Sequence, residues 1–365
     1  MYPDKATQAL FVLLRSGLWG TSPDDLAPFP LAPAEWDAVH AMARRQTVTA
    51  LVYRGLGLLP EPLLPPDALL MRWVAQVASI EQQHRRTNVA LGRLYDMFRR
   101  QGLTPVLQKG QGIAMLYDEP TLRECGDIDL YFPRSGEWER AARLIETLGI
   151  PLQRMPDGSV SYIYDGVEVE HHTRLIDLHN PAMRKPLARI EAQCGYRAVT
   201  LPGIPDQAIT LPSPMLDLLL LDTHIMKHAL GRGIGLRQLC DMARACHSHH
   251  ATADIDTLQT THRKAGTLRW HRLLHTFMVE HLGLATPLAA PLAAPLATSA
   301  SLLSRVLAGG NFGLHRPGAQ APGQSIWQRK LSTARSFVRN ARFACSYAPQ
   351  ESIWTFLHLL TGQIK

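Results

Sequence analysis

Gly126-Asp127-Ile128-Asp129-Leu130 is the most informative segment of this 365-residue sequence. Polar and apolar side chains alternate strictly from residue 127 to residue 132, which predicts a β-strand with one buried face. Alternate side chains of a strand point to the same side, so Asp127 and Asp129 share one face, with α-carbons about 6.5–7 Å apart. Ile128 and Leu130 then point into a core on the opposite face.

The paired aspartates suggest a metal site. Two carboxylates on one strand face repel each other unless a cation lies between them. Mg²⁺ prefers oxygen ligands and is commonly held by one or two carboxylates together with substrate phosphates. Two such ions can stabilise the attacking and leaving oxygens of a phosphoryl transfer. Taken alone, the pattern also fits an edge strand with solvated aspartates, so the surrounding sequence has to decide.

A turn upstream of this strand favours the metal interpretation. Residues 104–107 form a short strand candidate that ends in Lys109-Gly110, and a short helix is expected over 111–117. Glycine lets backbone N–H groups approach a phosphate, and lysine adds a positive charge beside it. Lys109 and Gly110 are therefore candidates for holding the phosphates of a nucleotide.

Further elements follow the strand at short intervals. Residues 137–148 place apolar side chains on one helical stripe that ends at Gly149. The dipeptide Asp165-Gly166 separates two strand candidates, 161–164 and 167–172, and predicts a tight hairpin. A third short strand is expected over 175–179.

The rest of the chain is predicted to be helical. A long helix is expected over 67–100, with two more over 215–230 and 236–247 after the capping Ser213-Pro214. We therefore expect an α+β fold, in which a small mixed-sheet core is flanked by N-terminal and C-terminal helical regions. Four regions are predicted: residues 1–102 (helical), 103–205 (the α/β core), 206–284 (helical, on the substrate side) and 285–365 (a Pro-Leu-Ala-rich linker followed by a basic helical part, with its last helices from about 325).

Composition narrows the class of protein. Hydrophobic residues make up 46% and charged residues 19%, which is typical of globular proteins and excludes collagen-like and wholly disordered chains. The 5 cysteines include no CxxC pair, so a disulfide framework and a zinc ribbon are not indicated. The sequence has no export signal and no apolar run near the roughly 20 residues of a membrane span. We expect a cytoplasmic protein without a membrane partner.

The positive charge is concentrated near the C-terminus. The formal net charge is +7, and residues 281–350 contain no aspartate or glutamate. A basic segment of this kind can attract phosphates or acidic partners, although a solvated helix face is the simpler interpretation. The basic residues of the segment are Arg305, Arg316, Arg329, Lys330, Arg335, Arg339 and Arg342.

Several of these motifs together resemble a known family. The run from Lys109-Gly110 through Leu116-Tyr117, Pro120 and Arg123 to the 126–130 segment resembles the uncharacterised bacterial nucleotidyltransferase family, which is related to polymerase-beta-type nucleotidyltransferases. The resemblance covers roughly residues 105–245. It continues through Leu148-Gly149, a later strand with an acidic residue two positions before a histidine, and His224, Lys227, Leu236 and Asp241.

The resemblance implies a mixed sheet with three carboxylates that bind Mg²⁺, two ions being expected. It also implies a nucleoside triphosphate as substrate. The wider superfamily has Gly-Ser at its phosphate loop, whereas this sequence has Gly110-Gln111.

The third carboxylate has two candidates. Glu170 lies in Val169-Glu170-His171-His172, and Asp177 lies in Ile176-Asp177-Leu178-His179. Glu170 is favoured because the hairpin signal before it is stronger, and its strand face also carries Glu168 and His172. Asp127, Asp129 and Glu170 are thus the expected metal ligands, with Asp177 as the alternative.

Other polar side chains are weaker candidates. Arg123 could neutralise charge on the transferred phosphates, or form an ion pair with Glu124, Asp127 or Asp129. His172 and Lys227 are expected near the nucleotide. His171 and His179 could bind a transition metal, although such histidines more often form hydrogen bonds. The remaining candidates are also consistent with exposed helix surfaces: His224 and His228 beside Lys227 on one helix face, His247, His249 and His250 near a helix end, and Arg335, Arg339 and Arg342 as a basic stripe.

The predicted function is a metal-dependent nucleotidyltransferase. It would move a nucleoside monophosphate from an NTP, with ATP as the expected nucleotide, to an acceptor and release pyrophosphate. The acceptor (a small molecule, peptide, protein or RNA) and the oligomeric state are left open. Two alternatives are a catalytically silent nucleotide- or partner-binding module on the same fold, and a nucleic-acid-binding protein that uses segment 281–350.

Overall fold

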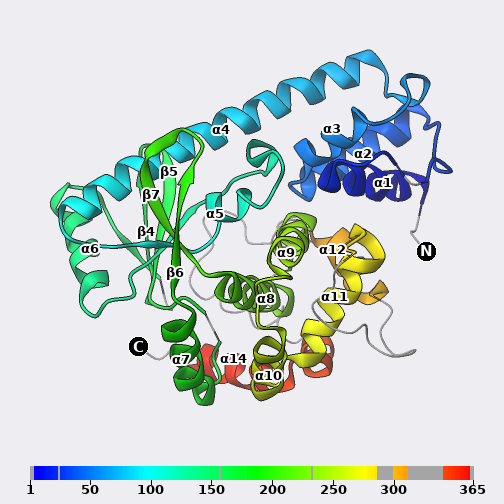
Figure 1. Cartoon of the computed structure of the whole chain (residues 1–365). Helices are drawn as coiled ribbons and strands as arrows, with labels where there is room; N and C mark the ends of the chain where they lie inside the picture. The colour runs from blue at the N-terminus through cyan, green and yellow to red at the C-terminus, as the bar shows by residue number, and fades with distance from the viewer. Residues whose placement is uncertain are drawn as a thin grey trace.

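The computed structural model describes residues 4–23, 25–155, 158–176, 178–231, 233–285, 299–310 and 340–361, apart from the side chains of residues 205, 206 and 358–361. Its elements confirm a mixed α+β fold with flanking helices (Figure 1). No helix in this part of the chain is long and apolar enough to cross a membrane.

Four helices precede the sheet: α1 (Lys5–Trp19), α2 (Pro33–Arg45), α3 (Thr49–Leu56) and α4 (Asp67–Arg100). α4 has 34 residues, so it is about 51 Å long at 1.5 Å per residue. It runs along the top of the molecule from α1–α3 to the sheet (Figure 1). Its first half buries Trp73 in the core of the N-terminal helices, while its second half buries Leu94 and Phe98 against the sheet.

The main sheet has five strands in the order β1-β2-β5-β4-β3. β2 (Ile128–Tyr131) and β5 (Val167–His172) are parallel neighbours, whereas the other neighbouring strands are antiparallel. The edge strands are β1 (Val106–Leu107) and β3 (Gln153–Arg154), and β4 (Val160–Tyr164) lies between β5 and β3. The predicted mixed sheet is therefore confirmed. Its two parallel strands carry Asp129 and Glu170, and Asp127 directly precedes β2.

Local turn chemistry sets the position of these strands. Asp165 and Gly166 both have positive φ angles, 48° and 75°, as a tight hairpin turn of this type requires. The predicted hairpin is confirmed as β4–β5. The predicted helix over 137–148 is confirmed as α6 (Glu137–Thr147), and Gly149 follows it with φ 74°.

The strand predicted over 175–179 is wrong, because none of the described residues in that stretch belongs to a strand. Leu175 and Leu178 pack into the large helical core, which explains the apolar pattern of this stretch. The backbone N–H groups of His179 and Asn180 donate to the carboxylate of Glu351, at 2.5 and 3.2 Å, instead of to a neighbouring strand.

A second hairpin was not predicted. β6 (Tyr196–Leu201) and β7 (Ile204–Pro212) pair in antiparallel fashion around Pro202-Gly203, and Gly203 has φ 83°. β7 packs against β1 and α4. Two further elements between β5 and β6 also escaped the sequence pattern, namely the single-turn helix η3 (Pro181–Met183) and α7 (Arg184–Cys194).

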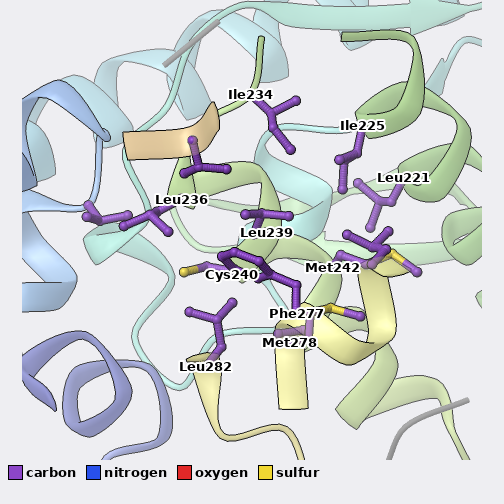
Figure 2. Close-up of a cluster of buried hydrophobic side chains, with 14 of the residues drawn as sticks. Leu221, Ile225, Ile234, Leu236, Leu239, Cys240, Met242, Phe277, Met278 and Leu282 are labelled. Carbon is purple, nitrogen blue, oxygen red and sulfur yellow. The ribbon is translucent and has the colours of Figure 1, made fainter. Parts of the chain in front are cut away.

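The remaining helices are α5 (Gln111–Ala114), the single-turn helices η1 (Glu61–Leu63) and η2 (Pro120–Leu122), and α8 (Pro214–Leu230), α9 (Leu236–His249), α10 (Ile255–Ala265), α11 (Leu268–Leu282), α12 (Ala300–Gly309) and α14 (Pro349–Thr361). Figure 2 shows Leu221 of α8, Leu239 and Met242 of α9 and Phe277 of α11 packed into one apolar cluster. That core also includes residues of α1–α3. The helices on either side of the sheet in sequence are thus held together, which fixes α8 and α9 beside it.

Most of the basic C-terminal segment lies outside the described residues, Arg335 and Arg339 included. Arg305 and Arg342 are the members of the basic set that the structure describes. Arg305 donates to Asn340 at 2.7 Å, and its guanidinium lies over the ring of Phe343. This contact ties α12 to the chain just before α14.

Candidate active site

Asp129 and Glu170 lie directly beside each other on the parallel strands β2 and β5. The parallel register of β2 and β5 pairs Asp129 with Glu170, and the neighbouring pairs Ile128–Val169 and Leu130–His171 are fully buried. Residues paired in this register project to the same side of a sheet. The sequence separates the two carboxylates by 41 positions, and the parallel pairing brings them together.

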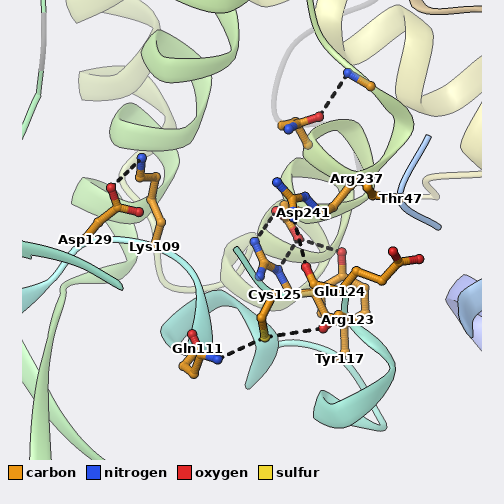
Figure 3. A network of polar contacts seen from close by, with 12 residues as sticks. Thr47, Lys109, Gln111, Tyr117, Arg123, Glu124, Cys125, Asp129, Arg237 and Asp241 are labelled. Atoms are coloured by element: carbon orange, nitrogen blue, oxygen red, sulfur yellow. Dashed lines mark hydrogen bonds and ion pairs between the residues drawn. The ribbon is translucent and has the colours of Figure 1, made fainter. Parts of the chain in front are cut away.

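Asp129 is at the centre of the polar contacts. Its side chain is 2% exposed, and its Oδ1 atom lies 3.1 Å from Nζ of Lys109 and 2.6 Å from Nε2 of His172. Figure 3 shows the contact with Lys109. The same Nε2 atom of His172 lies 3.3 Å from a carboxylate oxygen of Glu170. Asp129, Glu170 and His172 each offer a ligand atom within 4.8 Å of the others, a spacing that suits a single ion.

The electrostatics of the site favour a bound cation. Burial alone would raise the pKa of Asp129, but the charges and hydrogen bonds of Lys109 and His172 outweigh it and hold that pKa below its usual value. The charge of Asp129, together with burial, raises the pKa of Asp127. Burial and then the charge of Asp129 raise the pKa of Glu170. Three carboxylates thus compete for the compensating charge of one lysine, and this oxygen-rich donor set fits a hard divalent cation.

Lys109 and Gly110 hold the turn that faces these carboxylates. Gly110 has φ 64° and ψ −118°, and a Cβ atom there would lie 3.4 Å from the backbone oxygen of Asp127. Glycine is therefore favoured at this position for its backbone angles, which L side chains rarely adopt. Burial acts to lower the pKa of Lys109, but Asp129 and Asp127 raise it above its usual value, so the side chain is a cation.

Helix α8 borders the same group of residues. Burial lowers the pKa of His224 well below its usual value, and the positive charges of Lys109, His228, Lys227 and His172 lower it further. His224 is therefore a neutral imidazole close to the site. Its ring centroid lies 4.5 Å from that of His228, one turn along the helix. Of the predicted helix face, His224 is thus the residue whose electrostatic interactions with Lys109 and His172 connect α8 to the site.

Arg123 forms an ion pair with Asp241 of α9. Its Nε and Nη2 atoms donate to the two carboxylate oxygens of Asp241, each at 2.8 Å, and the Tyr117 hydroxyl donates to the same carboxylate at 2.8 Å (Figure 3). The Arg123 side chain is 7% exposed. Its ion-pair partner is therefore Asp241 and not Glu124, Asp127 or Asp129, while the predicted phosphate contact stays a prediction. Arg123 instead connects the loop before β2 to α9.

Arg237 is a site-bordering residue that the sequence did not reveal. It lies at the start of α9, where its Nη1 atom donates to the backbone oxygen of Glu124 at 3.1 Å. The same atom lies 3.8 Å from the position that a Cβ atom would take at Gly126. Its charge acts to lower the pKa of Asp127, after the larger effects of Asp129, burial and Lys109. The only signal in the sequence is its position directly after Leu236.

The other histidine candidates are held apart from the carboxylates. His171 is buried on the opposite face of the sheet, where Nε2 lies 2.8 Å from the hydroxyl of Tyr162. His179 contacts Glu351 of α14. His249 lies 3.3 Å from Asp217 within the helical core. Asp177, the alternative third carboxylate, lies outside the described residues.

A mixed sheet with clustered carboxylates on two parallel strands, beside a lysine–glycine turn, defines a nucleotidyltransferase-type core. Comparison with protein families agrees, because residues 32–283 match the family described as "Uncharacterised nucleotidyltransferase". The chain belongs to this family, and nucleotidyl transfer is its general activity. The comparisons with curated proteins and with solved structures each found no match.

Proposed function

We propose that the protein transfers a nucleoside monophosphate from an NTP, with ATP as the preferred nucleotide, to an acceptor and releases pyrophosphate in a Mg²⁺-dependent reaction. The observation that carries this proposal is the pairing of Asp129 with Glu170 on adjacent parallel strands, with Asp127 beside them. Mg²⁺, when bound, would neutralise phosphate charge and orient the triphosphate for attack.

The carboxylates have distinct roles in this proposal. Asp127 and Asp129, with Glu170 as the third ligand, would hold the metal. Asp129, Glu170 and His172 contact one another, and Glu170 has the most exposed side chain of the three. It is 24% exposed, against 2% for Asp129. Burial and the charge of Asp129 raise the pKa of Glu170. A carboxylate with a raised pKa accepts a proton more readily, so Glu170 is suited to take the proton from the acceptor hydroxyl.

The cations serve the nucleotide. Lys109 is a buried ammonium next to the carboxylates, and it would contact the triphosphate once a divalent ion shares their charge. His172 donates to Asp129 and so fixes the orientation of that carboxylate. Lys227 is one turn beyond His224 on α8, and it would extend the positive surface toward the phosphates.

The direct test is turnover with defined nucleotides. The purified full chain is mixed with Mg²⁺ and each α-³²P-labelled NTP, together with a small-molecule extract or a protein fraction as acceptor. We expect pyrophosphate release and transfer of label, strongest with ATP and abolished by chelator and by Asp127→Asn. Tight Mg²⁺-dependent NTP binding without pyrophosphate release would overturn the proposal.

The silent-module alternative has one observation in its favour. The wider superfamily has serine after the loop glycine, whereas this chain has Gln111. This residue is 1% exposed, and its Nε2 atom donates to Sγ of Cys125 at 2.9 Å. The side chain therefore points into the protein and adds no hydroxyl to the phosphate loop. A nucleic-acid role for segment 281–350 stays a separate prediction, which requires an affinity that falls steeply with added salt.

A further inference from the structure

A second polar cluster is buried among the helices, away from the sheet. Asp222 of α8, His262 of α10 and His271 and His275 of α11 are each at most 1% exposed. The rings of His262 and His271 are stacked with centroids 4.2 Å apart, and those of His271 and His275 lie 4.4 Å apart. Nδ1 of His271 lies 2.7 Å from Oδ2 of Asp222.

Several atoms of this cluster have no hydrogen-bond partner among the described residues. They are Oδ1 of Asp222, Nε2 of His262, Nε2 of His271 and both ring nitrogens of His275. A buried polar group without a partner costs roughly 1–3 kcal/mol, and more if it is charged. Five such atoms gathered around one carboxylate call for a physical explanation, and a bound ion is one of the few available.

The hydrogen bonds of His262 show which of its nitrogens faces the cluster as a ligand. The hydroxyl of Thr267 donates to the backbone oxygen of His262 at 3.4 Å, and it lies 2.9 Å from Nδ1 of the same residue. The contact with Nδ1 is the shorter of the two, so Nε2 is the ring nitrogen that faces Asp222. Metal-bound histidines are typically oriented in this way, with the second ring nitrogen bonded to an oxygen.

Nε2 of His262 and Oδ2 of Asp222 face each other at 3.8 Å. This separation is too long for a hydrogen bond, but both atoms can bind one cation. Tetrahedral Zn²⁺, with bonds of about 2.0–2.1 Å, places its ligand atoms roughly 3.3 Å apart. The separations of 3.8 Å to His262 and 2.7 Å to His271 lie on either side of that value. All three groups offer ligand atoms within 4.8 Å of one another.

We infer that Asp222, His262 and His271 bind a zinc ion, with His275 as the fourth donor. His271 and His275 are four residues apart on α11, a spacing that places both rings on one helix face. The ligands come from α8, α10 and α11, and none is accessible to solvent. The ion therefore joins three helices and leaves no position for a substrate, as in structural zinc sites. The site is separate from the carboxylates of the sheet, so the inference does not depend on the proposed transferase reaction.

The test measures zinc in the untagged full chain. The protein is stripped with chelator, mixed with Zn²⁺, passed over a desalting column and analysed by mass spectrometry for metal content, with thermal melting in parallel. We expect about one tightly held zinc per chain and a melting temperature several degrees above that of the stripped protein. His262→Gln and Asp222→Asn should lose both the zinc and the zinc-dependent shift.

Two control variants make the result specific. His249→Gln changes a histidine that is also buried beside an aspartate in the same core, and it should keep the zinc. The double variant Glu170→Gln with His172→Gln should keep it too, which excludes zinc bound at the sheet. If the cluster variants do not fold, tetrahedral Co²⁺ absorption in the wild-type chain replaces them. Retention of zinc in His262→Gln, its loss in the double variant, or no tight zinc in the wild type would overturn the inference.

Discussion

Nζ of Lys109 and Oδ1 of Asp129 form a buried ion pair of 3.1 Å that connects the turn after β1 to the middle of β2. His172 donates to the same Oδ1 atom, so neither contact uses the second oxygen of Asp129. The lysine thus partly neutralises the carboxylates while leaving Asp129 an oxygen for other partners. A divalent ion that shares the negative charge would release Lys109 toward phosphate.

The first prediction concerns Lys109→Met, which keeps most of the side-chain volume and removes the charge. We expect NTP affinity in the presence of Mg²⁺ to fall roughly 10–100-fold, the equivalent of one charge-assisted contact. Affinity for Mg²⁺ alone should not fall, because the lysine competes with the ion for Asp129. Isothermal titration calorimetry measures both constants.

A matched control for this change is Lys185→Met, at an exposed lysine near the start of α7. It should leave NTP affinity unchanged. Equal NTP affinity in wild type and Lys109→Met would show that Lys109 serves only as the ion-pair partner of Asp129.

The second prediction separates the two aspartates. Both Asp127→Asn and Asp129→Asn should lose Mg²⁺-dependent turnover by more than about 100-fold, because each removes a negative metal ligand. Their effects on folding should differ. Asp129→Asn leaves buried Lys109 without its closest counter-charge, which should cost about 3 kcal/mol of unfolding free energy. Asp127→Asn should not destabilise the metal-free chain. Chemical denaturation of both variants in chelator gives the comparison.

The pH dependence of this stability difference has a definite sign. The pKa of Asp127 is raised in the folded chain, so its contribution to stability is present at low pH and is lost as the pH rises through the folded value. In chelator at pH 8, Asp127→Asn should therefore melt above wild type, and the difference should shrink toward acid. A wild type that is the more stable of the two at pH 8 would contradict the repulsion between Asp127 and Asp129.

The elements predicted correctly are those with local signals. The alternation of residues 127–132, the Asp165-Gly166 turn and the glycine after α6 each act within a few positions. The strand expected over 175–179 failed because apolar residues also occur in loops that pack on a core. The β6–β7 hairpin was missed although Pro202-Gly203 offered a turn signal.

The residues of the candidate site also divide into those with a local sequence signal and those without one. Asp127, Asp129 and Lys109 are close in sequence and could be selected from it. Arg123 and Asp241 are partners across 118 positions, and no local pattern reveals such a pair. The buried cluster was not predicted. The sequence contains the four-residue spacing of His271 and His275, but their proximity to Asp222 depends on how α8 packs against α11.

The third prediction concerns the third carboxylate. Glu170→Gln should lose as much turnover as Asp129→Asn, because it removes the negative charge that lies opposite Asp129 in the parallel register. Glu168→Gln is the matched control, two positions earlier on the same strand face, where the exposed side chain accepts from Ser161 at 3.2 Å. It should stay within about twofold of wild type. Asp177→Asn should be milder than Glu170→Gln, and the reverse order in initial-rate measurements would make Asp177 the third ligand.

The last prediction concerns Arg123→Lys. Lysine keeps the charge, but its single ammonium cannot make the two parallel hydrogen bonds that Arg123 makes to Asp241 in a buried setting. We expect a loss of about 2 kcal/mol in unfolding free energy, measured by urea denaturation. Because Arg123 contacts Asp241 and not the carboxylates of the sheet, NTP affinity measured well below the melting temperature should equal that of wild type. Tyr117→Phe, which removes the third hydrogen bond to Asp241, should destabilise the chain in the same direction by a smaller amount. A fall in NTP affinity for Arg123→Lys, with the stability of the chain unchanged, would return Arg123 to the nucleotide site.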